Sequence, residues 1–343
     1  MAWKYAPVWV LAGALVMVAG CAPAPAGRPP AAHAARVAAP YFVTLAFQRP
    51  EAPAVVTDAV TGRKLWVVHP PVSGTRFTGV AAAGDDRTFV LAAEEQPNAP
   101  AARFYELRLT RNGHPRLLVL LPVPRVAYGD TFAVSPDGSK LVIGTGTATR
   151  GAIEVVSLAS GAVQAWPAAS GHASDLSWAG NRFVAFQWWD GSRSARAARS
   201  RSGVRLLDTA AAGRGLMASR LIVHQSARTS LGNFTAVGSP LISANGSRLF
   251  ASVEWAGGGQ QDPMAEVVEF SARTGQALAV VTPPADESGM GTWCGALWTD
   301  PSGTRATAIC ASTGSIDRGH FTSTNLHVPR YNASTPRDSF IAW

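Results

Sequence analysis

The chain is poor in cysteine, in lysine and in charged residues generally. Its 343 residues include three cysteines, and charged residues make up 15% of them. Together with 33 glycines and 24 prolines, this composition excludes a coiled coil and a wholly disordered chain. After the first 21 residues, no apolar run is long enough to cross a membrane. What remains is an exported protein built mainly from β-strands.

The charge that is present is mostly arginine. The formal net charge is +8, and only Lys4, Lys64 and Lys140 among the 30 basic residues are lysines. The arginines are scattered, and no known nucleic-acid-reading motif occurs. We therefore expect no nucleic-acid partner.

Residues 1–21 have the features of an export signal. Lys4 precedes an apolar stretch of about fourteen residues, which is shorter than the roughly twenty that span a membrane. The stretch ends in Val18-Ala19-Gly20-Cys21, which resembles the lipobox of bacterial lipoproteins. That resemblance implies an acylated Cys21 at the outer face of the cytoplasmic membrane. The alternative is a secretory peptide cleaved at a later small residue, for instance after Ala24.

Residues 22–40 are mostly alanine, proline, glycine and arginine and show no periodicity. Such a segment cannot bury a core, so it is expected to be an extended tether between the anchor and the folded part.

From residue 41 to 343, two kinds of β-hairpin alternate. One has a tight polar turn, as in Ser135-Pro136-Asp137-Gly138, between short apolar runs. The other has a glycine turn, as in Ser160-Gly161 or Thr274-Gly275. Glycines of the second kind are spaced 51, 48, 52 and 62 residues apart. Each unit therefore holds four strands in about fifty residues, which is typical of a β-propeller blade.

This alternation resembles bacterial WD40-like and TolB- or YncE-like propellers, a class without shared catalytic residues. We predict one all-β propeller with six four-stranded blades, seven being the alternative. Three strands within residues 41–69 and the tail Phe340-Ile341-Ala342-Trp343 would form one blade and close the ring. The other blades are expected at 77–121, 128–168, 173–223, 234–284 and 290–329.

Cys294 and Cys310 flank one predicted hairpin symmetrically. Cys294 lies six residues before Asp300 and Cys310 lies six after Thr304, so the two cysteines face each other across the strands. Opposed Cα atoms at this spacing are within disulfide range, and an exported protein encounters oxidising conditions. We predict a disulfide; two buried free thiols are the alternative.

Catalytic and metal-binding motifs are missing from the sequence. It has no G-x-S-x-G motif, no phosphate-binding loop and no histidines at metal-ligand spacing. We expect no metal and no cofactor. Carboxylates such as Asp130, Asp175 and Glu254 lie near inner-strand or loop positions, and a structural role is the alternative to a catalytic one.

Long loops between second and third strands offer a candidate ligand-binding surface. The loop 189–203 combines aromatic and basic residues, which suit anionic or sugar-like partners through stacking and paired hydrogen bonds. The alternative is a solvated basic insert. The predicted contact residues are Trp188, Trp189, Asp190, Arg193, Arg196 and, from the next blade, Trp255.

These observations predict a monomeric, lipid-anchored propeller that binds an envelope protein, a glycan or a small ligand without catalysis. One alternative is an envelope hydrolase or lyase with its site in the central funnel, which would need convergent acids. A purely structural protein is the other.

Overall fold

Nearly all regular structure in the described part of the chain is β-strand. The computed structural model describes residues 41–46, 52–58, 61–94, 101–124, 131–147, 150–169, 171–191, 200–211, 215–255, 265–281, 293–299, 305–311, 316–322 and 339–342. A short 3-10 helix, η1 (Leu216–Ala218), interrupts the strands. No helix within these ranges is long and apolar enough to cross a membrane. The predicted signal sequence and tether lie outside the described residues.

The strands form five sheets, which we number along the chain. Sheet 1 has the order β24 (Ser339–Ala342), β1 (Tyr41–Ala46), β2 (Ala54–Asp58), β3 (Lys64–Val68). Sheet 2 contains β4 (Arg76–Ala82), β5 (Thr88–Glu94), β6 (Ala102–Leu109) and β7 (Pro115–Leu120). Sheet 3 contains β8 (Phe132–Val134), β9 (Lys140–Thr147), β10 (Arg150–Ser157) and β11 (Val163–Ala168). Sheet 4 contains β12 (His172–Ala179), β13 (Phe183–Trp189), β14 (Gly203–Asp208) and β15 (Arg220–His224).

Sheet 5 is larger than one blade. It contains β16 (Ala227–Thr229), β17 (Gly232–Ile242), β18 (Arg248–Trp255), β19 (Ala265–Ser271) and β20 (Ala277–Val280). A single parallel pair, Ala265 with Trp293, joins them to β21 (Trp293–Thr299), β22 (Arg305–Ala311) and β23 (Ile316–Thr322). The sequence did not predict β16, which forms a hairpin with an unusually long β17, nor did it predict η1.

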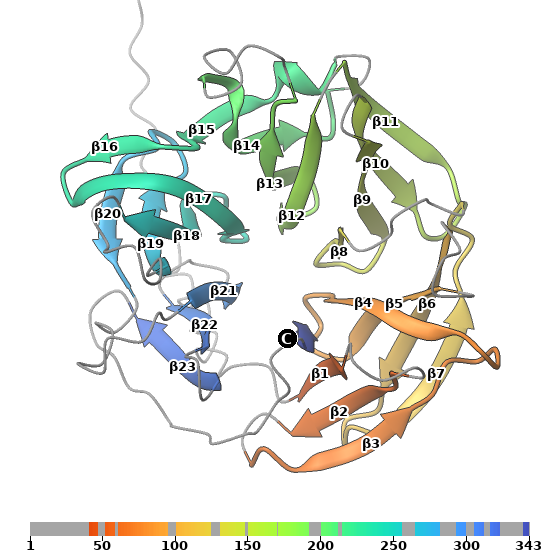
Figure 1. Cartoon of the computed structure of the whole chain (residues 1–343). Helices are drawn as coiled ribbons and strands as arrows, with labels where there is room; N and C mark the ends of the chain where they lie inside the picture. Colours follow the sequence, from red (N-terminus) through yellow and green to blue (C-terminus); the bar gives the residue numbers. More distant parts are fainter. Residues whose placement is uncertain are drawn as a thin grey trace, which may run out of the picture. The chain divides into compact units, whose positions relative to one another are not determined.

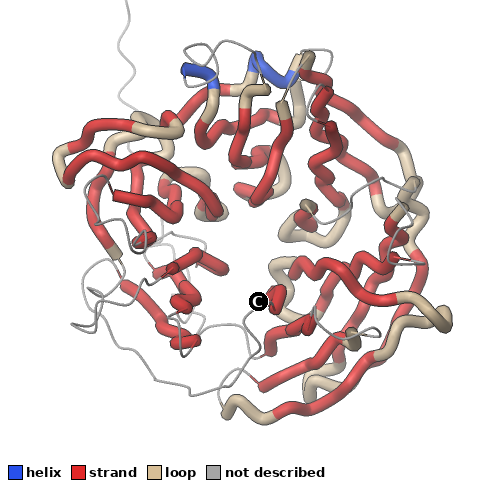
Figure 2. Tube along the Cα trace, viewed as in Figure 1, coloured by secondary structure: helices blue, strands red, loops and turns tan. Residues whose placement is uncertain are grey.

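The sheets are arranged in chain order around a common centre, with β4, β8, β12, β17 and β21 toward it (Figures 1 and 2). The hydrophobic core is divided among the spaces between neighbouring sheets. One buried cluster joins sheets 1 and 2, and others join sheets 2 and 3, 3 and 4, and 4 and 5. The all-β propeller fold predicted from the repeats is therefore confirmed.

Sheet 1 combines strands from distant parts of the chain, as predicted. Strand β24 pairs antiparallel with β1, with Leu45 opposite Phe340 and Val43 opposite Ala342. The number of blades and the closure of the ring stay predictions, because residues 323–338 lie outside the described part.

The polar hairpin turns depend on a glycine at one position and a side-chain acceptor at another, as their sequence predicts. Gly138 has a φ of 70°, a left-handed conformation that favours glycine. The Asp137 carboxylate accepts the Ser139 N–H at 3.0 Å, which fixes the turn. At the equivalent turn in sheet 5, Asn245 accepts the Ser247 N–H at 3.0 Å.

The glycine turns also bring neighbouring sheets into close contact. A Cβ placed on Gly161 would lie 2.6 Å from the Pro122 carbonyl oxygen of the preceding unit. The equivalent Gly275 is pressed against the Ile222 carbonyl in the same way. The regular spacing of these glycines therefore reflects both a left-handed turn and the packing of one sheet on the next.

Candidate functional site

The predicted loop site begins at two neighbouring tryptophans that face opposite ways. Trp188 is 0% exposed and belongs to the core between sheets 3 and 4, so its prediction as a ligand contact is wrong. Trp189 is 39% exposed and stacks on His172, with ring centroids 6.4 Å apart. Successive strand residues point to opposite faces, which is why one tryptophan packs inside and the next reaches solvent.

The other predicted contacts are only partly available to a ligand. The Asp190 side chain is 3% exposed and lies 3.9 Å from an Arg201 nitrogen, so its role is structural. Trp255 donates its indole N–H to Glu266 at 2.7 Å and remains partly exposed. Arg193 and Arg196 lie outside the described residues, as do Asp130 and Cys21, the predicted site of lipidation.

The register of β21 and β22 places Cys294 directly opposite Cys310. The count from the hairpin turn is therefore confirmed for the backbone. The disulfide itself stays a prediction.

Toward the centre, β12 and β17 each carry a one-residue bulge at equivalent places. The pairing shifts between Ser174 and Ser177 in β12, and between Gly238 and Leu241 in β17. At these bulges Asp175 has a φ of 50° and Ser239 a φ of 45°, left-handed conformations that are unusual outside glycine. Strained positions of this kind cluster at functional sites.

The two bulges are joined by hydrogen bonds between sheets 4 and 5. The Ser239 N–H donates to the Asp175 carboxylate at 3.3 Å, and Gln187 donates its amide to the Val237 carbonyl at 2.8 Å. Asp175 has access to solvent, yet protein surrounds it closely enough that burial raises the pKa of its carboxyl. The ionised form of Asp175 is therefore less compatible with the folded state than the protonated form.

We expect Asp175→Asn to raise stability at neutral pH. With a folded-state pKa above 3.8, ionised Asp175 disfavours the folded state, so the free energy of unfolding falls as pH rises from about 4 through the raised pKa. Asparagine also tolerates the left-handed backbone. In urea unfolding at pH 7, the variant should be more stable than the parent, and the difference should vanish near pH 3.

Asp208→Asn is the matched control with the opposite sign. The Arg182 guanidinium beside Asp208 lowers the pKa of that carboxyl, so this substitution should reduce stability at pH 7. Equal stability of Asp175→Asn and the parent at both pH values would contradict the account of Asp175.

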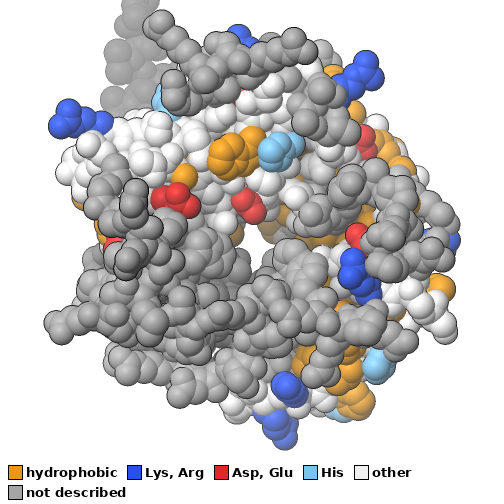
Figure 3. Space-filling model, viewed as in Figure 1, with side chains coloured by type: hydrophobic (Ala, Val, Ile, Leu, Met, Phe, Trp, Pro, Cys, Tyr) orange, Lys and Arg blue, Asp and Glu red, His pale blue; other side chains and the backbone are white. Residues whose placement is uncertain are grey.

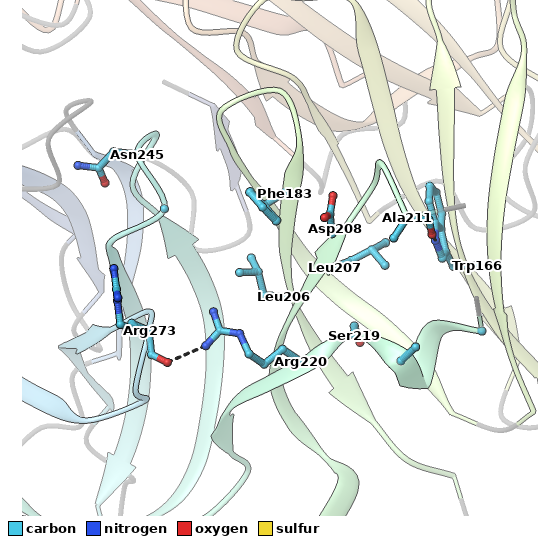
Figure 4. A pocket seen from close by; sticks show the side chains of 13 residues that line it. Trp166, Phe183, Leu206, Leu207, Asp208, Ala211, Ser219, Arg220, Asn245 and Arg273 are labelled. Atoms are coloured by element: carbon cyan, nitrogen blue, oxygen red, sulfur yellow. Dashed lines mark hydrogen bonds between the residues drawn. The ribbon is translucent and has the colours of Figure 1, made fainter. Parts of the chain in front are cut away.

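A groove of about 440 Å³ lies beside sheet 4, between it and both of its neighbours. Such a volume is within the range of small-molecule sites. Its floor is apolar, and Figure 4 shows Leu206 and Leu207 on opposite sides of their strand, with Phe183 on the side of Leu206 and Trp166 on the side of Leu207. Trp166 is fixed by donating its indole N–H to the Ala211 carbonyl at 3.2 Å.

Basic side chains border the groove on the side of sheet 5. The Arg220 guanidinium donates to the carbonyls of Arg273 and Ala272, both at 2.8 Å (Figure 4). The Arg273 side chain is exposed and makes no hydrogen bond to another described residue. The acid at the groove, Asp208, is neutralised by Arg182 through two bonds of 2.9 and 2.6 Å. The groove thus carries a net positive charge beside an apolar floor.

The hydroxyl that lines the groove, Ser219, is not positioned as a nucleophile. The Ser219 hydroxyl donates to the Leu216 carbonyl at 2.6 Å and accepts from Arg205 at 3.0 Å, so no base activates it. Across the described ranges, no three His, Cys, Asp or Glu residues are grouped to hold a metal ion. Sequence reasoning missed this groove because its lining comes from three sheets and contains no motif.

Comparisons with known proteins are informative for the fold. No protein-family model matches the chain, and no curated protein sequence matches it. Among solved structures, a putative TolB from Agrobacterium tumefaciens superposes with a TM-score of 0.52 and 11% identity, over 84% of this chain and 87% of that one. The periplasmic gluconolactonase PpgL of Pseudomonas aeruginosa superposes with a TM-score of 0.50 and 15% identity, over 87% of this chain and 85% of that one.

TolB from Acinetobacter baumannii is also similar, with a TM-score of 0.49 and 16% identity over 88% of this chain. The chain spans 66% of the length of that TolB. At these identities the likeness concerns architecture alone. It agrees with the observed sheets and their order, and the chain has the fold of a TolB-like β-propeller.

Proposed function

We propose that the protein is a lipid-anchored, non-enzymatic binding module of the bacterial cell envelope. Its ligand is an anion with an apolar body, held in the groove beside sheet 4. The observation that carries this proposal is the groove itself, which pairs an apolar floor with exposed Arg273 and lacks an activated nucleophile. An ion pair to arginine and burial of apolar surface together recognise such a ligand.

The structural neighbours support an envelope location. One of them, with a TM-score of 0.50, is described as a periplasmic gluconolactonase. The lipobox-like Val18-Ala19-Gly20-Cys21 gives this chain a route to the same compartment.

The groove is tested with decanoate, an apolar chain ending in a carboxylate. A chain beginning at residue 22 keeps all described strands and core clusters, so it is suitable for calorimetry without the signal sequence. We expect Arg273→Gln to weaken decanoate binding about tenfold, because it removes a charge-assisted hydrogen bond. Leu206→Asp should abolish binding by placing a like charge on the floor.

Arg228→Gln is the matched control, since Arg228 is an exposed arginine of β16 that does not line the groove. Decanoate binding that survives both groove substitutions, or that is lost in the control, would rule out the groove as the site.

Anchoring is tested separately by mass spectrometry of the protein expressed with its own signal sequence. We expect the mature chain to begin at an acylated Cys21, and Cys21→Ala to remain unprocessed and unacylated. Recovery of an unmodified chain beginning after Ala24 would instead establish a secreted protein.

One observation favours the alternative of a hydrolase with its site near the centre of the ring. Asp175 combines a left-handed backbone with a raised carboxyl pKa, and such perturbed acids are candidates for general acid–base roles. A hydrolytic activity toward lactones that is lost in Asp175→Asn, with the fold intact, would establish this alternative.

A further inference from the structure

An exposed apolar surface lies on the outermost strands of sheets 1 and 2. We call it the outer patch and define it by five residues of β3 and β7. Their exposed fractions are 41% for Trp66, 51% for Val67, 41% for Leu117, 43% for Val119 and 51% for Leu120. Strands β3 and β7 are the ends of their sheets, so neither pairs with a further strand in the described structure. Large exposed apolar surfaces usually mark interaction sites.

The turn before β7 packs against sheet 1 next to the outer patch. The His114 ring lies against Trp66 with centroids 4.7 Å apart. The Tyr41 hydroxyl donates to the Arg111 carbonyl at 2.5 Å, and Gly113 is packed against Leu65 and Tyr41. Sheets 1 and 2 are therefore held in contact where Trp66 meets the turn before β7.

The segments that carry the outer patch are basic, and the nearest acids are Asp58, which caps the turn before β3, and Glu106, opposite Val119 on β6. The segments 61–84 and 107–129 contain no Asp or Glu. Four basic side chains are exposed beside the apolar residues: Arg63, Lys64, Arg111 and Arg116. In Figure 3, basic and histidine side chains lie among hydrophobic ones at the lower right edge of the molecule, over this part of the fold.

This mixture matches the surface of an anionic bilayer. Tryptophan and aliphatic side chains enter the interfacial region, while Lys and Arg reach the lipid phosphates. A second copy of the chain is a poor partner, because two such surfaces would bring like charges together. The chain enters the fold at Tyr41, in sheet 1. A tether over residues 22–40 would therefore attach to the same sheet as β3.

We propose that the outer patch docks the propeller on a bilayer containing anionic lipids. Docking would fix which face of the propeller is turned to the membrane, something that a flexible tether alone does not do. The inference rests on the proposed function for bringing the domain to a membrane, but the contact itself does not need the acyl chains.

The test uses the unacylated chain that begins at residue 22, cosedimented with vesicles. We expect it to bind vesicles of phosphatidylglycerol and phosphatidylethanolamine, to bind phosphatidylcholine vesicles weakly, and to lose affinity as salt rises. Arg63→Glu with Lys64→Glu should lower the partition coefficient at least about tenfold. Leu117→Ser with Leu120→Ser should also lower it, which purely electrostatic attraction would not require.

The matched control is Arg150→Glu with Arg228→Glu, which makes the same change in net charge at exposed positions of sheets 3 and 5. Unchanged thermal unfolding would show that all variants remain folded. Three outcomes would overturn the proposal: no binding to anionic vesicles, equal losses in the patch and control variants, or a solution dimer that the patch variants dissociate without any vesicle binding. Vesicle binding by a chain whose Cys21 proves not to be acylated in cells would refute the anchor and leave the patch standing.

Discussion

A chain that ends at residue 338 should lose its cooperative folded state. Without β24, the central edge of β1 has no partner along the four paired positions from Val43 to Ala46. These positions are in the core: Val43 is 0% exposed and Leu45 is 1% exposed. Each buried backbone group left without a partner costs about 1–3 kcal/mol, so the total approaches the 5–15 kcal/mol that stabilises a typical domain. The expected result is aggregation, or unfolding at a much lower urea concentration.

A chain that ends at residue 342 is the matched control, because it removes Trp343 and keeps every paired residue of β24. It should unfold at the same urea concentration as the parent. If the chain ending at residue 338 also did so, the pairing between β1 and β24 would contribute little to stability.

Much of the fold could be predicted from the sequence because its repeats are set by local chemistry. Turns such as 135–138 need glycine at one backbone position and a side-chain acceptor at another, and both can be read directly. The joining of the C-terminal tail to the first sheet could be predicted by counting strands. The opposition of Cys294 and Cys310 followed from the length of one turn.

The candidate site was less predictable because it depends on which face of a strand a residue occupies. Trp188 and Trp189 look equivalent in sequence, and only the pairing of β12 with β13 decides that the first is buried. The bulges at Asp175 and Ser239 have no sequence signature, since neither contains glycine at the strained position. The groove at Leu206 brings together residues from three sheets, which no local pattern reveals.

The role of Arg205 could not be predicted either, because nothing in the sequence distinguishes it from the many other arginines. It lies on β14 and is 6% exposed. Its guanidinium donates to the Ser219 hydroxyl at 3.0 Å and to the Ser219, Met217 and Arg201 carbonyls at 2.6, 3.1 and 3.2 Å. Burial lowers the pKa of Arg205, and the nearby Asp190 carboxylate opposes that shift.

Arg205→Met should lower the free energy of unfolding by about 3–5 kcal/mol. The substitution leaves buried carbonyls without donors and removes the cation that offsets buried Asp190. Arg205→Lys should recover only part of the loss, because an ammonium group cannot reproduce the planar fork of donors. Both variants are compared with the parent by urea unfolding at pH 7.

Arg182→Met is the control that separates burial from ion pairing. Arg182 makes two short bonds to Asp208, but its side chain is 61% exposed, so the loss should stay below about 1 kcal/mol. The expected losses of stability differ because the two arginines differ in their access to solvent. Water replaces the lost partner of Asp208, whereas Arg205 and its partner Ser219 are largely shielded from water, at 6% and 7% exposed. Similar losses in the free energy of unfolding at Arg182 and Arg205 would contradict this explanation. They would show that the hydrogen bonds of Arg205 stabilise the fold no more than a surface ion pair does.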